Sequence, residues 1–595
     1  MNTLTAKSEK SAMPFPAKWQ AIQWQEAEEY VEKLQKRIFH AEKNENKRKV
    51  RDLQRMLMNS KSALLLSIKR VTQTNKGKRT AGIDGFKALK PEERLALYLE
   101  MSKMELSLHK PKPAYRTYIK KKNGKLRPLG IPTIKDRVYQ NVVKLALEPQ
   151  WEARFEPTSY GFRPKRGCHD AMTRIWLSLR GNSTKSWVFE GDFKSCFDTL
   201  SHDFILKQLE GFPQTSIIAK WLEAGFLDNN VFSETTEGTP QGGIISPLLA
   251  NIALHGMEKA LGIKYDTRNT NRTKYSLCRY ADDFVVMCPT LKDAENIRTI
   301  LADYLTDRGL TLADDKTKIT HVENGFDFLG FNVRRYNVTI CKKGQKPHAG
   351  KTLLIKPSND SVKTLKAKIK DEFAKARGRN AQALIGRLNP IITGTANYWK
   401  TQVAKEKFSD IDHYVWQKTR RWLNRSHPDK SWKWKIEKYF KPDKTGQSKA
   451  KWILTDHKTG NQLKRMQWTA IKRHVMIEHD STPFDSSLTE YFRKRDIREF
   501  ENNNVSSRQK LAKKQNYVCP MCKRSITDFR EGLEVHHIVP KHHGGNNEYK
   551  NLQLVHVSCH IEYHRVFPVK GVLPSQSQKV KTFNDIRLKC MANMV

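Results

Sequence analysis

The stretch YADDFVVM, residues 280–287, places two acidic residues directly before an aliphatic run. Residues 284–287 are of types that favour β-strands, and an unbroken apolar run is typical of a buried strand. Asp282 and Asp283 stand at the start of this strand. Because burying an unpaired carboxylate costs several kcal/mol, either another group compensates the two acids or they lie at a strand turn that faces a cleft.

A third acid has a similar setting earlier in the chain, in the stretch VFEGDF. Residues 188–193 read as a strand, and Asp192 lies at its end. If the two strands lie side by side, Asp192, Asp282 and Asp283 form one cluster, which repels itself unless cations bind. Carboxylate ligands suit Mg²⁺, and two Mg²⁺ ions about 3.5–4 Å apart commonly serve in-line phosphoryl transfer. For an Asp-Asp pair taken alone, the alternative is a solvated turn.

The charge balance indicates a polyanionic partner. The chain has 108 Lys and Arg against 62 Asp and Glu, a formal net charge of +46. Such a surplus destabilises a compact chain unless a polyanion neutralises it. The basic residues are spread along the whole chain rather than gathered on one amphipathic helix, which argues against a membrane surface and favours nucleic acid.

The sequence shows no sign of export or of a membrane anchor. No apolar run approaches the roughly 20 residues of a membrane span, and the N-terminal stretch MNTLTAKSEKSAMPF lacks the apolar core of a secretory signal. The nine cysteines are an odd number, and most have no framework spacing, which argues for a reducing setting. We expect a cytoplasmic location, in a bacterium or an organelle, and no membrane partner.

Hydrophobic periodicity predicts a multidomain α+β protein. Residues 19–70 have helical spacing, residues 112–165 contain short β-like pieces, and residues 185–335 alternate between β-rich and helical stretches. Residues 360–440 return to helical periodicity, and residues 441–510 are polar and basic with weak periodicity, as in a linker or a small DNA-contacting module. The periodic apolar positions of the first helical region are Trp24, Ala27, Val31, Leu34 and Ile38.

The stretch around Asp282 resembles the catalytic loop of reverse transcriptases, and five further motifs stand in that family's order. The segment 120–140 looks like the fingers of the group II intron-encoded branch, of the bacterial or the organellar, chloroplast-like kind. The resemblance implies a right-hand polymerase of fingers and palm, in which Asp192, Asp282 and Asp283 hold two Mg²⁺ ions for RNA-directed DNA synthesis. The five motifs are KKKNGKLRPLGIPTIKDRVYQ (120–140), SYGFRPKRGCHDA (159–171), EGTPQGGIISPLLANIALHGME (237–258), GLTLADDKTKI (309–319) and FDFLGF (326–331).

The same resemblance implies roles for residues around the acids. Lys121 and Arg127 match fingers cations that grip the incoming nucleoside triphosphate, for which Arg supplies a fork of donors. Phe197 matches the steric gate, a bulky ring that clashes with a ribose 2′-hydroxyl. Gln241, followed by two glycines, matches the loop under the templating pair, where glycines let the backbone approach nucleic acid. Lys316 matches a lysine near the leaving pyrophosphate, a candidate proton donor.

Simpler explanations stand beside some of these roles. A cation in the basic run, such as Lys120, Lys122 or Lys125, can be a solvated charge. A phenylalanine such as Phe197 can be an ordinary core residue.

Two further regions resemble the same family. LIGRLNPIITGTANYWK and HYVWQKTRRWLNR, within residues 381–440, are similar to its maturase domain, and SIKRVTQTNKGKRTAGIDG (67–85) is similar to its N-terminal extension. The spacing of Trp416, Arg420 and Leu423 suits a helix that packs inward and shows cations to RNA.

Two pairs of metal-ligand residues lie near the C-terminus. Cys519 and Cys522 form one pair, His556 and Cys559 form the other, and 33 residues separate the pairs. This spacing predicts a tetrahedral structural zinc site. His556 is a departure from the four cysteines that zinc ribbons usually have.

The stretch between and after these pairs, EVHHIVPKHHGGNNEYKNLQLVHVSCHIEYH (534–564), resembles an HNH nuclease. The resemblance implies one catalytic metal ion held by His536, His560 and His564. It implies that His537 is the general base that activates water, which suits an imidazole near neutral pH, and that Asn551 orients this base or braces the loop. The alternative for a His-rich tail is opportunistic metal binding.

Together these resemblances imply a multifunctional group II intron protein. It would bind its intron RNA, assist splicing, and accompany the lariat to a DNA duplex, where the HNH domain nicks the second strand and the new 3′ end primes cDNA synthesis from dNTPs. One or two protein copies would sit on the RNA. The expected domains are an N-terminal helical extension (1–85), fingers and palm (86–355), a maturase or thumb domain (356–440), a DNA-binding region (441–510) and the HNH domain with its zinc site (511–595).

Two other functions are considered. A splicing factor with a vestigial polymerase is disfavoured by the intact acids at 192, 282 and 283. A non-intron reverse transcriptase with a defence role, fused to a nuclease, is disfavoured by the maturase-like stretch.

Overall fold

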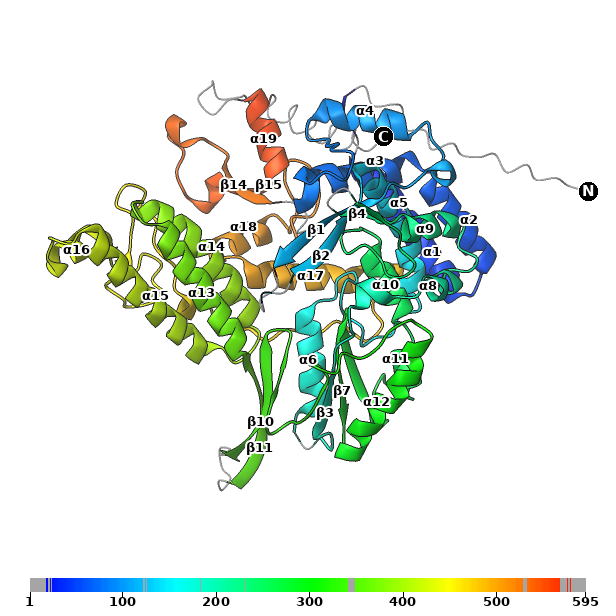
Figure 1. Cartoon of the computed structure of the whole chain (residues 1–595). Coiled ribbons are helices and arrows are strands. Elements are labelled where there is room, and N and C mark those ends of the chain that lie inside the picture. The colour runs from blue at the N-terminus through cyan, green and yellow to red at the C-terminus, as the bar shows by residue number, and fades with distance from the viewer. Residues whose placement is uncertain are drawn as a thin grey trace, which may run out of the picture.

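A computed structural model describes residues 18–19, 22, 24–120, 124, 126–181, 183–228, 231–340, 348–527, 532–567, 575 and 578. It is a multidomain α+β structure whose strands fall into several separate sheets (Figure 1). Among the described helices, none combines the length and the apolar content that a membrane crossing requires.

The first helical region forms three helices rather than one. They are α1 (Trp24–Lys43), α2 (Lys47–Met58) and α3 (Lys61–Lys69). Asn46 and Ser60 separate them, because their side chains accept hydrogen bonds from the first turns of α2 and α3. Four of the five predicted apolar positions are fully buried and Trp24 is half-buried. All three helices pack on α5 (Ile134–Glu152), so the extension shares the hydrophobic core of the palm.

The fingers contain a four-stranded sheet of order β2-β1-β4-β5. β1 runs antiparallel to β2 and parallel to β4, which links the basic segment around residue 120 to a short hairpin about a hundred residues later. The bounds are β1 (Ala114–Lys120), β2 (Leu126–Ile131), β4 (Phe226–Asp228) and β5 (Val231–Ser233), with α4 (Pro91–Met101) before them.

The palm is an antiparallel sheet of order β6-β7-β3-β8 that is covered on both faces. Phe189 and Val286 belong to the core that contains the N-terminal helices, whereas Val188 and Val285 belong to the core that contains the thumb. Burial on both faces explains why β7 reads as an unbroken apolar run. The bounds are β3 (Trp187–Gly191), β6 (Ser276–Tyr280), β7 (Asp283–Cys288) and β8 (Lys318–His321), with helices α6 (Cys168–Leu179), α7 (Cys196–Thr199), α8 (His202–Gln208), α9 (Thr215–Glu223), α10 (Ser246–Ala253), α11 (Met257–Ala260) and α12 (Leu291–Thr306).

A hairpin and four helices follow the palm, as the helical periodicity of residues 360–440 predicts. Leu423 is buried and Arg420 is exposed, in agreement with a helix that packs inward on one side. In Figure 1 these helices lie on the opposite side of the palm from the N-terminal ones. The bounds are β9 (Phe326–Phe328), β10 (Phe331–Ile340), β11 (His348–Pro357), α13 (Asn359–Lys375), α14 (Ala381–Trp399), α15 (Lys405–Ser426) and α16 (Trp432–Tyr439), followed by β12 (Phe440–Lys441) and β13 (Ile453–Leu454).

Residues 471–503 run along the palm instead of forming a separate unit. Arg166 donates through Nη2 to the His479 carbonyl at 2.7 Å. His474 Nε2 lies 2.8 Å from Asp170 Oδ1. The part of this segment before residue 489 leads into α17 (Thr489–Asn503), a helix that the weak periodicity of residues 441–510 did not reveal.

The C-terminal unit has a small core of its own, built around Leu511, Ile526 and Leu554. It contains α18 (Ser506–Lys514), the antiparallel pair β14 (Leu533–His537) and β15 (Leu552–His556), and α19 (Val557–Val566).

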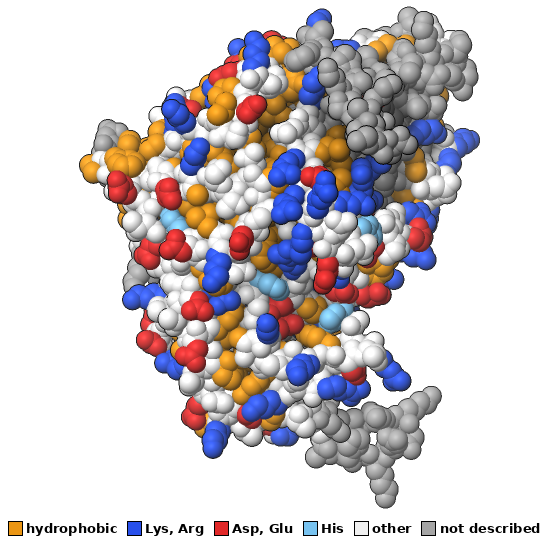
Figure 2. Space-filling model, turned by 90° about the vertical axis from the view of Figure 1, so that its right-hand side faces the viewer, with side chains coloured by type: hydrophobic (Ala, Val, Ile, Leu, Met, Phe, Trp, Pro, Cys, Tyr) orange, Lys and Arg blue, Asp and Glu red, His pale blue; other side chains and the backbone are white. Residues whose placement is uncertain are grey.

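The basic surplus is distributed over the surface. Figure 2 shows Lys and Arg side chains across most of one face, with Asp and Glu side chains among them. The charge therefore does not form one isolated patch on this face.

Candidate active sites

The three palm acids lie at the same end of the inner palm strands β3 and β7. Ala281 and Asp282 form the turn between β6 and β7, and Asp283 pairs with Tyr280 across it. Gly191 pairs with Phe284, so that Asp192 follows β3 beside the first residue of β7. Of the two alternatives for Asp282 and Asp283, the structure therefore shows the strand turn.

The acids perturb one another's titration. Desolvation and the charges of Asp282 and Asp192 raise the pKa of Asp283 to about 6. Desolvation, followed by the charge of Asp192, also raises the pKa of Asp282. A site that disfavours its own carboxylate charges fits divalent cations, whose charge would reverse this effect. The oxygens of the three acids do not all lie within 4.8 Å of one another in this structure.

A backbone hydrogen bond within its motif places Lys316 beside the palm acids. The Ala313 amide donates to the Asp192 carbonyl at 2.9 Å. Lys316 Nζ lies 2.6 Å from Asp192 Oδ2, and this contact raises the pKa of Lys316. The lysine is therefore held as a cation beside the acids.

The fingers reach the palm through Arg127. This exposed residue of β2 donates from Nε to Gln241 Oε1 at 2.6 Å. Its charge also lowers the pKa values of Asp282 and Asp283, against the larger opposing effects. Lys121 lies outside the described residues.

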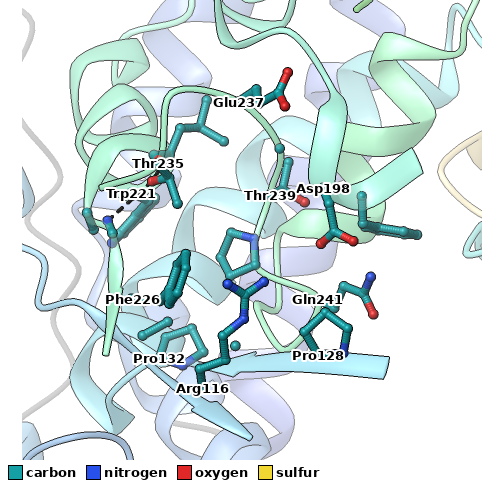
Figure 3. Close-up of a pocket in the computed structure, with 18 of the residues that line it drawn as sticks. Arg116, Pro128, Pro132, Asp198, Trp221, Phe226, Thr235, Glu237, Thr239 and Gln241 are labelled. Carbon is teal, nitrogen blue, oxygen red and sulfur yellow. Dashed lines mark hydrogen bonds between the residues drawn. The ribbon is translucent and has the colours of Figure 1, made fainter. Parts of the chain in front are cut away.

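A cavity of about 320 Å³ opens at the base of the fingers, and Phe197 and Gln241 form part of its wall (Figure 3). Arg116 extends into it with its guanidinium 3.8 Å from the centre of the Phe226 ring. Asp198 and other acids line the opposite side. Phe197 is only 8% exposed and belongs to the main hydrophobic core, so it is a core residue that also borders the cavity.

Gly242 allows a close backbone approach, but the partner in this structure is another part of the chain. A Cβ at this position would lie 2.2 Å from the Gly130 carbonyl oxygen. The close approach that requires glycine here is therefore a contact between the loop and β2 of the fingers, within the protein itself.

The four predicted zinc ligands come together near the start of the C-terminal unit. The ligand atoms of Cys519, Cys522, His556 and Cys559 all lie within 4.8 Å of one another, and all four residues are buried. His556 Nδ1 is 3.3 Å from Cys522 Sγ, and its Nε2 is 3.1 Å from the Ser525 carbonyl. Hydrogen bonds with Cys522 and Cys559 hold the pKa of Cys519 far above its usual range. Three buried cysteine sulfurs clustered with an oriented imidazole fit a thiophilic metal ion.

A second metal-ligand cluster contains His536, His560 and His564, whose ring nitrogens also lie within 4.8 Å of one another. His560 Nε2 and His564 Nε2 are 3.1 Å apart. The other nitrogen of each ring is engaged, with the Glu534 carboxylate for His560 and with the Phe567 carbonyl for His564. Both Nε2 atoms therefore face a common point, as ligands of one ion do.

His537 adjoins this cluster on β14, where successive side chains point to opposite faces. Its Nε2 lies 3.0 Å from Asn547 Oδ1. Asn551 donates to the carbonyls of Val539 (3.0 Å) and Asn546 (2.8 Å) and accepts from the Val539 amide. Of the two alternatives for Asn551, the contacts favour bracing of the loop.

Known proteins match this chain domain by domain. Residues 19–101 match the N-terminal domain of reverse transcriptase, and residues 119–333 match the reverse transcriptase (RNA-dependent DNA polymerase) family. Residues 362–440 match the group II intron, maturase-specific domain, and residues 519–565 match the HNH endonuclease family.

Two bacterial relatives match about half of the chain. Protein YkfC of Escherichia coli is 37% identical over 303 residues, which cover 45% of this chain and 79% of YkfC. Group II intron-encoded protein LtrA of Lactococcus lactis is 33% identical over 362 residues, 49% of this chain and 59% of LtrA. The chain belongs to the group II intron-encoded protein family. A telomerase from Candida albicans is 14% identical and covers 53% of this chain and 60% of its own, with a TM-score of 0.31 that is too low to compare folds.

This group II intron protein is multifunctional, with reverse transcriptase, maturase and HNH endonuclease domains on one chain. It is an RNA-directed DNA polymerase and a nuclease by its domains. Both enzyme classes generally use divalent metal ions, and RNA binding goes with the maturase domain.

In this group II intron protein, sequence reasoning missed the residues that support the turn between β6 and β7, which contains Asp282. Arg279 is 1% exposed, and its Nη1 donates to the Ala281 carbonyl and to Asn251 Oδ1, both at 3.1 Å. Asn251 Nδ2 in turn donates to the Gly161 carbonyl at 2.8 Å. A Cβ on Gly161 would lie 2.2 Å from the Ala281 nitrogen, so glycine lets this segment press on the turn. The available signal was a charged residue inside the apolar strand LCRY.

Proposed function

We propose that this chain carries out target-primed reverse transcription for its own intron. It binds the intron RNA, assists splicing, and stays on the lariat as a ribonucleoprotein that inserts the RNA into one strand of a target duplex. The HNH domain nicks the second strand, and the palm extends the new 3′ end with dNTPs. The supporting observation is that one chain combines three acids gathered at the ends of the palm strands with two metal-ligand clusters of different chemistry, both in the C-terminal unit.

At the ends of the palm strands, Asp192, Asp282 and Asp283 would hold two Mg²⁺ ions, which supply charge neutralisation and activation of the primer hydroxyl. Lys316 stands beside Asp192 as a cation that can give a proton to the departing pyrophosphate. Arg127, fixed by Gln241, presents its remaining guanidinium donors to the triphosphate.

Sugar selection in this proposal rests on Phe197. Its ring is backed by the main core, so it cannot move away from a 2′-hydroxyl without disturbing that core. Lys121 is assigned to the triphosphate by resemblance alone.

In the HNH domain, His536, His560 and His564 would hold one divalent ion, which stabilises the charge that develops on the phosphate. His537 takes a proton from the attacking water, and Asn547 orients its ring. Asn551 holds the loop that carries Asn547.

The Cys519, Cys522, His556 and Cys559 set would hold a structural Zn²⁺. These residues join the start of the domain to β15 and α19. Because the small core there is built around the same cysteines, metal binding would contribute to folding of the domain.

The remaining regions would handle RNA and target DNA. We assign residues 356–440 to RNA and residues 441–510 to the target duplex, and keep residues 1–85 as the extension, 86–355 as fingers and palm and 511–595 as the HNH unit. Lys and Arg outnumber acids in the first two regions.

Reconstitution tests the proposal. The purified chain is combined with a transcript of the RNA that flanks its coding region, and splicing, strand-specific cleavage of a duplex carrying the ligated exons, and cDNA synthesis are measured. Protein-dependent splicing and insertion are expected. A chain that polymerises on generic templates but leaves the flanking RNA unspliced would instead be a non-intron reverse transcriptase fused to a nuclease.

A further inference from the structure

A second cavity, of about 300 Å³, lies far from the acids of the palm. We call it the α15 pocket. Its floor is α15, and its outer wall is the segment 450–454 around β13. Helix α15, which forms its floor, lies beside α13 and α16 on the left of Figure 1. Its lining residues come from both sides of residue 440, the boundary between the regions assigned above to RNA and to target DNA.

Flat aromatic side chains line the α15 pocket. The rings of Trp416 and Trp452 are inclined by only 16°, with centroids 6.0 Å apart. Trp416 is fixed from behind, because Phe440 and Trp432 pack against it. Trp452 is 52% exposed. An indole held in place but left open to solvent offers a stacking surface for a planar ligand.

The rim of the pocket is basic. Lys451 and Lys464 line it and are both exposed. Among the described residues, neither lysine has a carboxylate within ion-pair distance, and Arg465 reaches Asp412 only at 3.6 Å. Cations that are not neutralised by the protein are available to phosphate groups.

The inner wall contributes one fixed acceptor. Asp412 is 8% exposed and lines the pocket. Its two carboxylate oxygens accept from the amides of Met466 (2.7 Å) and Gln467 (3.0 Å). These bonds fix the orientation of the carboxylate and leave it further lone pairs, since an ionised carboxyl group has about four acceptor sites.

We propose that the α15 pocket binds one unpaired nucleobase of RNA. The base stacks on Trp452, donates an amino or imino hydrogen to Asp412, and places its flanking phosphates against Lys451 and Lys464. RNA is the occupant because its loops and bulges present unstacked bases for this mode of recognition, and because Asp412 and Trp416 lie inside the maturase-specific match. The proposal rests on the RNA-binding part of the proposed function and is independent of both catalytic sites.

Affinity measurements on the full-length chain test it. The probe is a labelled single-stranded RNA of about 20 nucleotides, with DNA of the same sequence alongside. Trp452→Ala is expected to weaken RNA binding by about 5- to 150-fold, the range for loss of one base–aromatic stack. Trp452→Phe should retain most of the affinity. The matched control is Trp434→Ala, which removes an indole of the same region that packs on His427 and lies outside the pocket.

The outcomes separate the two proposals. If the wild-type chain does not bind the RNA, the proposed function fails. If it binds but Trp452→Ala retains its affinity, or Trp434→Ala loses as much, the α15 pocket proposal alone is overturned. An equal loss for DNA would also overturn it, because the occupant would then be DNA.

Photocrosslinking gives a readout that does not depend on a variant. RNA containing iodouridine is bound to the wild-type chain and irradiated, and the attached peptides are identified by mass spectrometry. Crosslinks at Trp452 or Trp416 are expected. Crosslinks confined to other regions would overturn the proposal.

Discussion

The buried arginine beneath the catalytic turn gives a sharp test of how the palm positions its acids. Arg279→Met keeps the length of the side chain but removes two hydrogen bonds, to the Ala281 carbonyl and to Asn251. A buried acceptor left unsatisfied typically lowers the free energy of unfolding by about 1–3 kcal/mol. A displacement of the turn by about 1 Å would lower the polymerisation rate by about 10²-fold.

The control is Arg335→Met. Arg335 is 6% exposed and donates from Nη2 to the carbonyls of Leu179 (2.9 Å) and Lys185 (3.0 Å), away from the turn. Both variants are compared by urea unfolding, RNA affinity and single-turnover dNTP incorporation. We expect similar destabilisation, unchanged RNA affinity, and a loss of rate in Arg279→Met only. Equal rates in the two variants, measured where both are folded, would refute the positioning role.

Other variants test the remaining assignments. Phe197→Val should admit ribonucleotides while keeping deoxynucleotide use, measured as the ratio of ribonucleotide to deoxynucleotide incorporation. An unchanged ratio would mean that Phe197 serves only in core packing. His537→Ala should lose second-strand cleavage with its metal content intact. Cys519→Ala should also lose this cleavage, but with release of zinc and protease sensitivity in the C-terminal unit. If His537→Ala still cleaves the second strand, His537 is not the general base. Burial, followed by the charge of Glu258, raises the pKa of Glu156 to about 7. The stability that this acid contributes is therefore present below about pH 4.5 and is lost as the pH rises to about 7. Glu156→Gln should flatten that fall, by at most about 3 kcal/mol, and an unchanged pH profile of unfolding would contradict it.

Local sequence patterns predicted several elements of this fold. The apolar run after Asp283 predicted a buried strand, and the spacing of Val31, Leu34 and Ile38 predicted the inward face of α1, because burial imposes a period on the sequence. The division of the first helical region needed the capping side chains of Asn46 and Ser60, which periodicity does not register.

The sites were predictable where ligands are chemically distinctive. Cysteine and histidine spacing predicted the set of Cys519, Cys522, His556 and Cys559, and the resemblance to HNH nucleases supplied the three-histidine set; the structure brings the ligand atoms of each set together. The contacts between distant segments that hold the site residues in place were not predictable. The bond from Arg279 to the turn, its link through Asn251 to Gly161, and the contact of Glu534 with His560 depend on how distant segments pack.

Primer extension by Asp282→Asn tests the central claim most directly. The variant is assembled with the RNA that flanks the coding region, and splicing, RNA affinity and cDNA synthesis from an annealed primer are measured on the same preparation. Removing one charge-stabilising group from such a site should lower cDNA synthesis by at least about 10²-fold, while splicing and RNA affinity match the wild-type chain. Polymerisation by Asp282→Asn at the wild-type rate would contradict the account.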